Sequence, residues 1–208
     1  MRGRPFAGGA GHTAGPFTVY VANEAGNTVT PIRAASHTAG RPIKVGPAPA
    51  LIAISPDGQT AYVVGTGSLV PGAAAPVTLT AIRTATNMPG RVITVCAPGN
   101  LSGTIAIAPD TIAITPDSRT AYVANASTGT VTPIRTATDT ALTKIRLAGG
   151  AGPIAITPDG RTAYVIAYSG PGRTGTVIPI RTATNQVLRA ITVSNLPSVI
   201  AITPAPRR

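Results

Sequence analysis

The chain has 208 residues, which is enough to bury most of its apolar surface within one domain. Hydrophobic residues make up 43% of it and aromatic residues only 3%, while 23 glycines and 21 prolines favour many short strands and turns and exclude a mainly helical protein. The formal net charge of +11 indicates either a polyanionic partner or a scattered, solvated surface charge, and no stretch is long and apolar enough to cross a membrane as a helix.

Residues 1–16 are rich in glycine, so we expect a loose tail; they begin with basic residues but lack the apolar segment of a signal peptide. From residue 17 onward, short β-branched runs alternate with turn residues in four successive units. A complete unit holds four strands, called a, b, c and d in chain order. The units occupy 17–45, 51–95, 112–147 and 153–193; the first lacks strand a, a lone strand follows at 199–203, and 205–208 form a basic tail.

The repeat is clearest where strand a turns into strand b. The fourth unit carries Ile154-Ala-Ile-Thr-Pro-Asp-Gly-Arg-Thr-Ala-Tyr-Val165, and closely similar runs begin at Ile52 and Ile112. Proline presets φ, aspartate bonds its own backbone and glycine tolerates positive φ, so Pro-Asp-Gly predicts the turn between the two strands. One tyrosine recurs in every b strand, and we expect the four to be buried equivalently between neighbouring units: Tyr20, Tyr62, Tyr122 and Tyr164.

The length of the repeat indicates the fold. Tyr122 and Tyr164 lie about 42 residues apart, and four strands in that length are what a propeller blade needs. The strands are apolar on both faces, as expected of blades covered by a neighbour on each side, whereas a two-sheet sandwich would alternate. We therefore expect an all-β protein, a β-propeller of four four-stranded blades, in which strand 199–203 completes the N-terminal blade and closes the ring. The alternatives are an open arc, a dimer with more blades, and a fragment of a larger propeller.

The second unit carries insertions at about 65–76, in its b–c loop, and at about 96–111, before the next strand a. The second insertion contains Ile105-Ala-Ile-Ala-Pro-Asp110, which competes with the similar run at Ile112 for the next inner strand. Because b–c and d–a loops emerge at the same end of a blade, both insertions and the lengthened loop 168–175 predict one uneven face. That face is a candidate binding surface, since loops on a rigid scaffold commonly carry function. Its candidate residues are Asn100, Asp110, Tyr168 and Arg173.

Arginine ends every c strand, and the a–b turns with their aspartates emerge at the same end of a blade. We expect surface ion pairs within the units. The alternative is an anion-binding ring in which the guanidinium groups converge away from these carboxylates. The arginines are Arg33, Arg83, Arg135 and Arg181, and the expected pairs are Arg83–Asp57, Arg135–Asp117 and Arg181–Asp159.

The chain resembles the YVTN-type β-propeller repeat in the runs Tyr122-Val-Ala-Asn125, Gly129-Thr-Val-Thr-Pro-Ile-Arg-Thr-Ala-Thr-Asp139 and Ile154-Ala-Ile-Thr-Pro-Asp-Gly160. The resemblance covers about residues 17–204 and extends to lactonase-like propellers. It implies a propeller that binds or scaffolds, secreted or at the cell surface of a prokaryote. The chain departs from the family in its repeated arginine, where aspartate is usual, and in having proline where valine is frequent. A proline in strand c removes a ladder donor, which a bulge or an interrupted strand d would accommodate; these prolines are Pro31, Pro133 and Pro179.

The sequence contains no catalytic constellation. His12 and His37 fall in the tail and in a loop, and the lone Cys96 excludes an intrachain disulfide and a cysteine-based metal cluster. A lactonase-like enzyme needs several carboxylates around one metal ion, whereas most acids here belong to turns. We therefore expect a non-enzymatic binding or scaffold protein without metal or cofactor, with a protein or polymer ligand, and able to self-associate if the ring is open. The alternatives are a lactonase-like small-molecule enzyme and a charge-driven polyanion binder.

Overall fold

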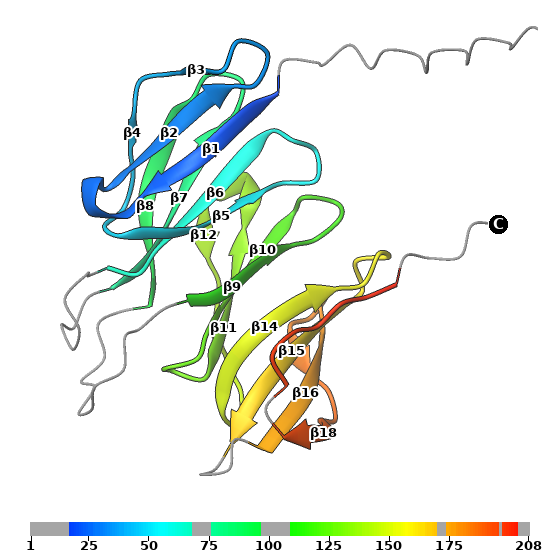
Figure 1. The fold of residues 1–208 in the computed structure, drawn as a ribbon. Helices are drawn as coiled ribbons and strands as arrows, with labels where there is room; N and C mark the ends of the chain where they lie inside the picture. Colours follow the sequence, from blue (N-terminus) through cyan, green and yellow to red (C-terminus); the bar gives the residue numbers. More distant parts are fainter. Residues whose placement is uncertain (1–16, 68–75, 97–108, 170–173, 196, 204–208) are drawn as a thin grey trace, which may run out of the picture.

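The computed structural model describes residues 17–67, 76–96, 109–169, 174–195 and 197–203. Within these ranges the protein is all-β, with no α-helix, and its strands form four antiparallel sheets that follow one another along the chain. Figure 1 shows the sheets as an arc, from the blue first sheet to the yellow and orange fourth sheet. The all-β prediction is confirmed, and the repeated sheets agree with a propeller-like fold.

Each sheet is a meander whose consecutive strands are neighbours, except that strand d is split into two short pieces in three of the sheets. The first sheet contains β1 (Thr18–Asn23), β2 (Thr28–Arg33), β3 (Thr38–Ala39) and β4 (Ile43–Lys44), with the 3-10 turn Glu24–Gly26 between β1 and β2. The second contains β5 (Pro49–Ile54), β6 (Thr60–Gly65), β7 (Val77–Arg83) and β8 (Met88–Cys96). The third contains β9 (Pro109–Ile114), β10 (Thr120–Asn125), β11 (Thr130–Arg135), β12 (Thr140–Ala141) and β13 (Ile145–Arg146), with a 3-10 turn at Thr136–Thr138. The fourth contains β14 (Gly150–Ile156), β15 (Thr162–Ser169), β16 (Thr174–Arg181), β17 (Gln186–Val187) and β18 (Ile191–Asn195).

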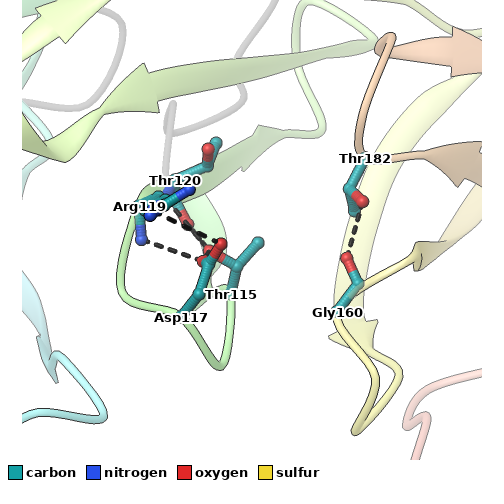
Figure 2. Close-up of polar contacts among 6 residues, drawn as sticks. All are labelled: Thr115, Asp117, Arg119, Thr120, Gly160 and Thr182. Carbon is teal, nitrogen blue, oxygen red and sulfur yellow. Dashed lines mark hydrogen bonds and ion pairs between the residues drawn. The ribbon is translucent and has the colours of Figure 1, made fainter.

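The turn between strands a and b is closed by its aspartate. In the third sheet, Asp117 Oδ1 accepts hydrogen bonds from the Thr115 hydroxyl at 2.6 Å and from the backbone N–H of Arg119 at 3.0 Å (Figure 2). Asp57 and Asp159 make the same two contacts in their own turns. These bonds, the hydroxyl bond first, hold the pKa of each carboxyl group below the ordinary aspartate value of 3.8. The hydrogen bonds within the turn thus account for the repeated aspartate, and no ligand is needed to explain it.

Proline in strand c is accommodated because strand d is interrupted opposite it. β3 pairs with the last two residues of β2 and β4 with its first two, which leaves a one-residue bulge opposite Pro31. The Pro31 carbonyl still accepts a hydrogen bond from the Gly40 N–H at 2.7 Å. Pro133 and Pro179 each accept an equivalent bond at 2.8 Å. The structure therefore combines the bulge and the interrupted strand that the sequence predicts.

The second sheet has Ala81 in place of this proline, and its strand β8 runs unbroken. Pairing of β7 with β8 shifts between Thr80 and Ile82, so Ala81 has no partner in that ladder. We expect Ala81→Pro to change the free energy of unfolding by no more than about 1 kcal/mol. Ala121→Pro is the control, since Ala121 is paired on both sides of β10, and it should cost more than about 2 kcal/mol because a buried carbonyl loses its donor. Urea denaturation measures both, and an equal loss in the two variants would contradict this role of the bulge.

Three apolar cores hold neighbouring sheets together. Each core joins the tyrosine-bearing face of one sheet to the alanine and valine face of the next. Between the third and fourth sheets, for example, Tyr122 shares a core with Ala163 and Val165, all of them fully buried. Alanine at this interface leaves room for the large ring, which is how a chain with few aromatic residues fills the gap between sheets.

The four repeated tyrosines have the same register but different burial. Each lies opposite the proline or alanine of its own strand c. Tyr62 and Tyr122 are 2% and 0% exposed, and burial raises the pKa of both to about 12. Tyr20 and Tyr164 are only partly buried: Tyr20 packs on the second sheet but its own sheet lacks strand a, and Tyr164 has no following sheet within the described residues. The expectation of equivalent burial therefore holds for the inner sheets and fails at the ends.

The arc has two free ends. Neighbouring sheets meet through their inner strands: β1 adjoins β5, β5 adjoins β9, and β9 adjoins β14. No comparable contact joins the first and fourth sheets within the described residues, and Figure 1 shows them at opposite ends of the arc. The predicted strand at 199–203 is not formed, since the described residues 197–203 have no strand pairing and the first sheet consists of β1–β4. The prediction that this segment completes the first sheet of the same chain is wrong, because it follows the fourth sheet at the far end.

The two competing Ile-Ala-Ile runs are resolved in favour of the later one, since Ile112 lies in β9 opposite Val123. Most of the two insertions, 68–75 and 97–108, lies outside the described residues, as does 170–173. The flanks of both insertions, Gly65, Val77 and Cys96, lie at one end of the second sheet, where Gly65 is paired with Thr78 and Val77 with Cys96.

Candidate anion-binding site

Clefts recur where the c–d edge of one sheet faces the c–d loop of the next. They have volumes of about 710 Å³ between the first and second sheets, 360 Å³ between the second and third, and 630 Å³ between the third and fourth. Their linings come from corresponding parts of the repeat, so their side chains can be compared position by position.

The first cleft gathers positive charge. Arg33 ends β2, Arg41 lies in the interruption of the edge strand, and Lys44 ends β4. All three side chains are exposed, and none of the residues lining this cleft is acidic. Three cations around one concavity without a carboxylate create a positive potential that attracts anions.

The opposite wall of the first cleft is the c–d loop of the second sheet, which includes Asn87. Asn87 has a left-handed backbone, with φ of 55°, and its Oδ1 accepts a hydrogen bond from the Tyr20 hydroxyl at 2.7 Å. Asparagine tolerates this conformation better than most residues. The bond fixes this wall against the first sheet, so the cleft is held between two anchored elements.

The other two clefts are less positive. Asp139 occupies the position of Asn87 in the second cleft, where Arg83 is the cation. Burial raises the pKa of Asp139, and the nearby Arg83 and Arg91 partly offset that rise. The third cleft contains one cation, Lys144. The first cleft is therefore the strongest candidate for an anion.

We expect Asp139→Asn to stabilise the protein at pH 7 by up to about 1 kcal/mol, the scale of a partly exposed charge. Because folding raises the pKa of this carboxyl, its cost to stability appears as the pH rises past the ordinary value of 3.8. Asparagine removes that cost, and Asn87 and Asn185 already accept a tyrosine hydroxyl at this position. Thermal unfolding should show the gain at pH 7 and little gain at about pH 3, below the ordinary pKa. A variant less stable than the parent at pH 7 would mean that attraction to Arg83 and Arg91 outweighs burial.

The expected pairs Arg83–Asp57, Arg135–Asp117 and Arg181–Asp159 are not formed. Within the described part of the chain, the ion pair within 4.0 Å joins Arg119 to Asp117 inside one turn, with both side chains exposed. The turn aspartates instead bond their own turns, and Arg83 acts on Asp139 of the next sheet. Nor do the four arginines converge on one point, because Arg33 and Arg83 line different clefts.

Two of the four candidate residues of the uneven face, Asp110 and Tyr168, lie in strands. Asn100 and Arg173 lie outside the described residues. Asp110 falls in strand β9. Tyr168 lies near the end of β15, and its hydroxyl donates to the Pro197 carbonyl at 2.7 Å, so its contact is with the segment after the last strand.

The sequence Thr-Ala-Thr-Asn follows strand c in the second and fourth sheets, at 84–87 and 182–185, and it supplies structural hydrogen bonds. The hydroxyls of Thr84 and Thr182 donate to the carbonyls of Gly58 and Gly160 at 2.7 and 2.6 Å, and Figure 2 shows the second bond. These bonds tie the end of strand c to the a–b turn of the same sheet. Among the described residues, no three His, Cys, Asp or Glu side chains gather as a metal site requires, and no helix there is long and apolar enough to span a membrane.

No protein-family model and no curated protein matches the chain. Among solved structures, it is similar to hydrazine synthase from Kuenenia stuttgartiensis, with a TM-score of 0.67 and 22% identity. The match covers 85% of this chain and 46% of the other, so this chain spans less than half the length of that one. At this identity the likeness shows a shared fold alone.

Arg41 and Lys44 are the site residues that sequence reasoning missed. The signal was present in Arg41-Pro-Ile-Lys44, a short edge segment whose two cations flank two apolar residues. Lys44 pairs opposite Thr28, at the start of β2, and Arg33 ends the same strand, so the cations are spread along one cleft and not clustered at one point.

Proposed function

We propose that the protein is a non-enzymatic binding module that holds an anionic polymer by charge, with the first cleft as its main site. The observation that carries the proposal is the set of Arg33, Arg41 and Lys44 around one cleft that has no acidic lining residue. Guanidinium forks bind phosphate or sulfate oxygens in pairs, and an ammonium binds them as a point charge. The net charge of +11 adds attraction at longer range.

Cations on the outer strands would extend this site along the arc. A polymer lying along the outer edges would meet them in turn. Charged edge strands also discourage pairing between copies, but that role does not require three cations around one cleft. The buried tyrosines are unavailable for base stacking, so recognition would rest on phosphate or sulfate groups. The exposed cations concerned are Arg91, Lys144, Arg146 and Arg189.

In this proposal the four sheets serve as four blades of a propeller scaffold. The resemblance to the YVTN-type repeat supports a secreted or cell-surface protein of a prokaryote. The lactonase-like alternative has no supporting arrangement of acidic side chains in the described residues, and a lactone-hydrolysis assay of the purified protein separates it from binding.

The test is a binding isotherm of the whole chain with a fluorescent sulfated polysaccharide and with random-sequence duplex DNA, using a neutral dextran as control. We expect dissociation constants of about 1–100 μM at roughly 0.1 M salt, with affinity falling steeply as salt rises. Tighter binding of one polymer identifies the sulfate or the phosphate backbone as the preferred partner. No binding of either polymer at low salt, or equal binding of dextran, would overturn the proposal.

A further inference from the structure

The first sheet lacks a strand that the other three sheets have. In those sheets strand b lies between strands a and c, whereas β1 pairs with β2 alone. The face of β1 that looks out of the arc is apolar and open, since Val19 and Val21 are 50% and 41% exposed. At the same positions of the third sheet, Ala121 and Val123 are 0% exposed. Within the described residues, nothing covers this end as a neighbouring sheet covers the others.

Residues 199–203 contain the sequence of the missing strand. Ile200-Ala-Ile-Thr203 repeats Ile154-Ala-Ile-Thr157, the first three residues of which pair with strand b of the fourth sheet. In this structure 199–203 pairs with no strand, and Val199 is 80% exposed. The Tyr168 hydroxyl bond to the Pro197 carbonyl ties the start of the segment to the fourth sheet, and Figure 1 shows the red segment at the end of the arc that the fourth sheet forms. The segment thus follows the fourth sheet in the chain, as β14 follows the third sheet, and it is available to serve as the inner strand of a following sheet.

A polar contact marks the same junction independently. The Tyr20 and Tyr122 hydroxyls reach to the next sheet and donate to Asn87 and Asn185, which both have left-handed backbones with φ of 55° and 56°. Tyr164 is the counterpart in the fourth sheet, and no hydrogen bond from its hydroxyl is formed within the described residues. In the first sheet, the corresponding left-handed residue is His37, with φ of 52°. Its ring nitrogen can accept the same bond.

We infer that copies of this chain associate head to tail, with the fourth sheet of one copy followed by the first sheet of the next. Strand 199–203 of one copy pairs antiparallel with β1 of the second copy, and Ile200 lies opposite Val21, as Ile154 lies opposite Val165. Tyr164 faces His37 of the second copy. The occupant is a second copy because both joining surfaces repeat the two sides of a contact formed three times within the chain. Head-to-tail contacts generate a ring when the rotation closes and a filament when it does not.

Disulfide trapping tests this inference without reference to anion binding. Residues directly opposite in an antiparallel pair have Cα atoms about 4.5–5.5 Å apart, which is within disulfide range. Val21→Cys and Ile200→Cys are made in separate chains, mixed and oxidised. The control mixes Ile200→Cys with Val187→Cys, because Val187 is 41% exposed like Val21 but lies on the outer edge. Wild type, whose Cys96 is buried, provides the background.

We expect a disulfide-linked pair of chains from the first mixture and not from the control, and light scattering of wild type should give a multiple of the chain mass. Tyr164→Phe should weaken this association about two- to ten-fold, the effect of one hydrogen bond. A chain carrying both cysteines that forms its disulfide internally, with no product from the mixture, would show closure within one chain and overturn the inference. Absence of any such disulfide, with a monomeric wild type, would overturn it as well.

Discussion

Replacing Tyr122 by alanine is expected to lower the free energy of unfolding by about 3–5 kcal/mol. The ring is 0% exposed and belongs to the core that joins the third and fourth sheets. Its loss leaves a cavity lined by Ala163 and Val165, which are too small to fill it, and removes the bond from its hydroxyl to Asn185 Oδ1 at 2.8 Å. Chemical denaturation monitored by far-UV circular dichroism measures the change.

Two matched variants separate the causes of that loss. Tyr122→Phe keeps the ring and loses only the hydroxyl bond, so it should cost about 0.5–1.5 kcal/mol. Tyr20→Ala removes the equivalent ring of the first sheet, which is only partly buried, and should cost less than Tyr122→Ala. Equal losses in Tyr122→Ala and Tyr20→Ala would contradict the conclusion that burial of Tyr122 between two complete sheets holds the third sheet to the fourth.

Replacing Arg33, Arg41 and Lys44 together by glutamine is expected to weaken binding of an anionic polymer on the order of 100-fold at about 0.1 M salt. Each cation that contacts a phosphate or sulfate releases a counterion, and the gain from that release is large at low salt. The three side chains are exposed, so the variant should fold like the parent. Fluorescence anisotropy with the polymers named above measures the loss.

The control changes the same charge elsewhere. Arg135, Arg161 and Arg181 are also exposed, belong to the third and fourth sheets, and line none of the three clefts. Their replacement by glutamine lowers the net charge equally and should weaken binding by less than about tenfold, through loss of long-range attraction alone. Equal losses in the two triple variants would mean that net charge, and not the first cleft, determines binding.

The repeated strands were predictable because each local signal agrees with the others. Pro-Asp-Gly specifies the a–b turn, β-branched runs specify strands, and the spacing of Tyr122 and Tyr164 specifies the length of a unit. The same reasoning failed at 199–203, which has the sequence of an inner strand. Whether such a segment finds a partner depends on where the first sheet lies in space, and no local pattern carries that information.

The site was less predictable for a related reason. Sequence geometry places Arg135 and Asp117 at one end of the third sheet, but it does not show that Thr115 and the Arg119 N–H already occupy the carboxylate. In the same way, Arg41 and Lys44 become part of a site only because the interrupted edge strand runs back along β2, so that both line the same cleft as Arg33. Contacts between side chains of separate strands can be identified only from the three-dimensional structure.

The salt dependence of binding to duplex DNA tests the anion-binding cleft most directly. It is measured for wild type and for the variant in which Arg33, Arg41 and Lys44 are replaced by glutamine. The logarithm of the association constant falls linearly with the logarithm of salt concentration, with a slope of about −0.9 for each phosphate neutralised. If the first cleft holds the polymer, the variant's slope should be shallower by about 2 to 3 units, and the control triple variant should keep the wild-type slope within about one unit. Wild type and the cleft variant with the same slope, or wild type that fails to bind at low salt, would contradict it.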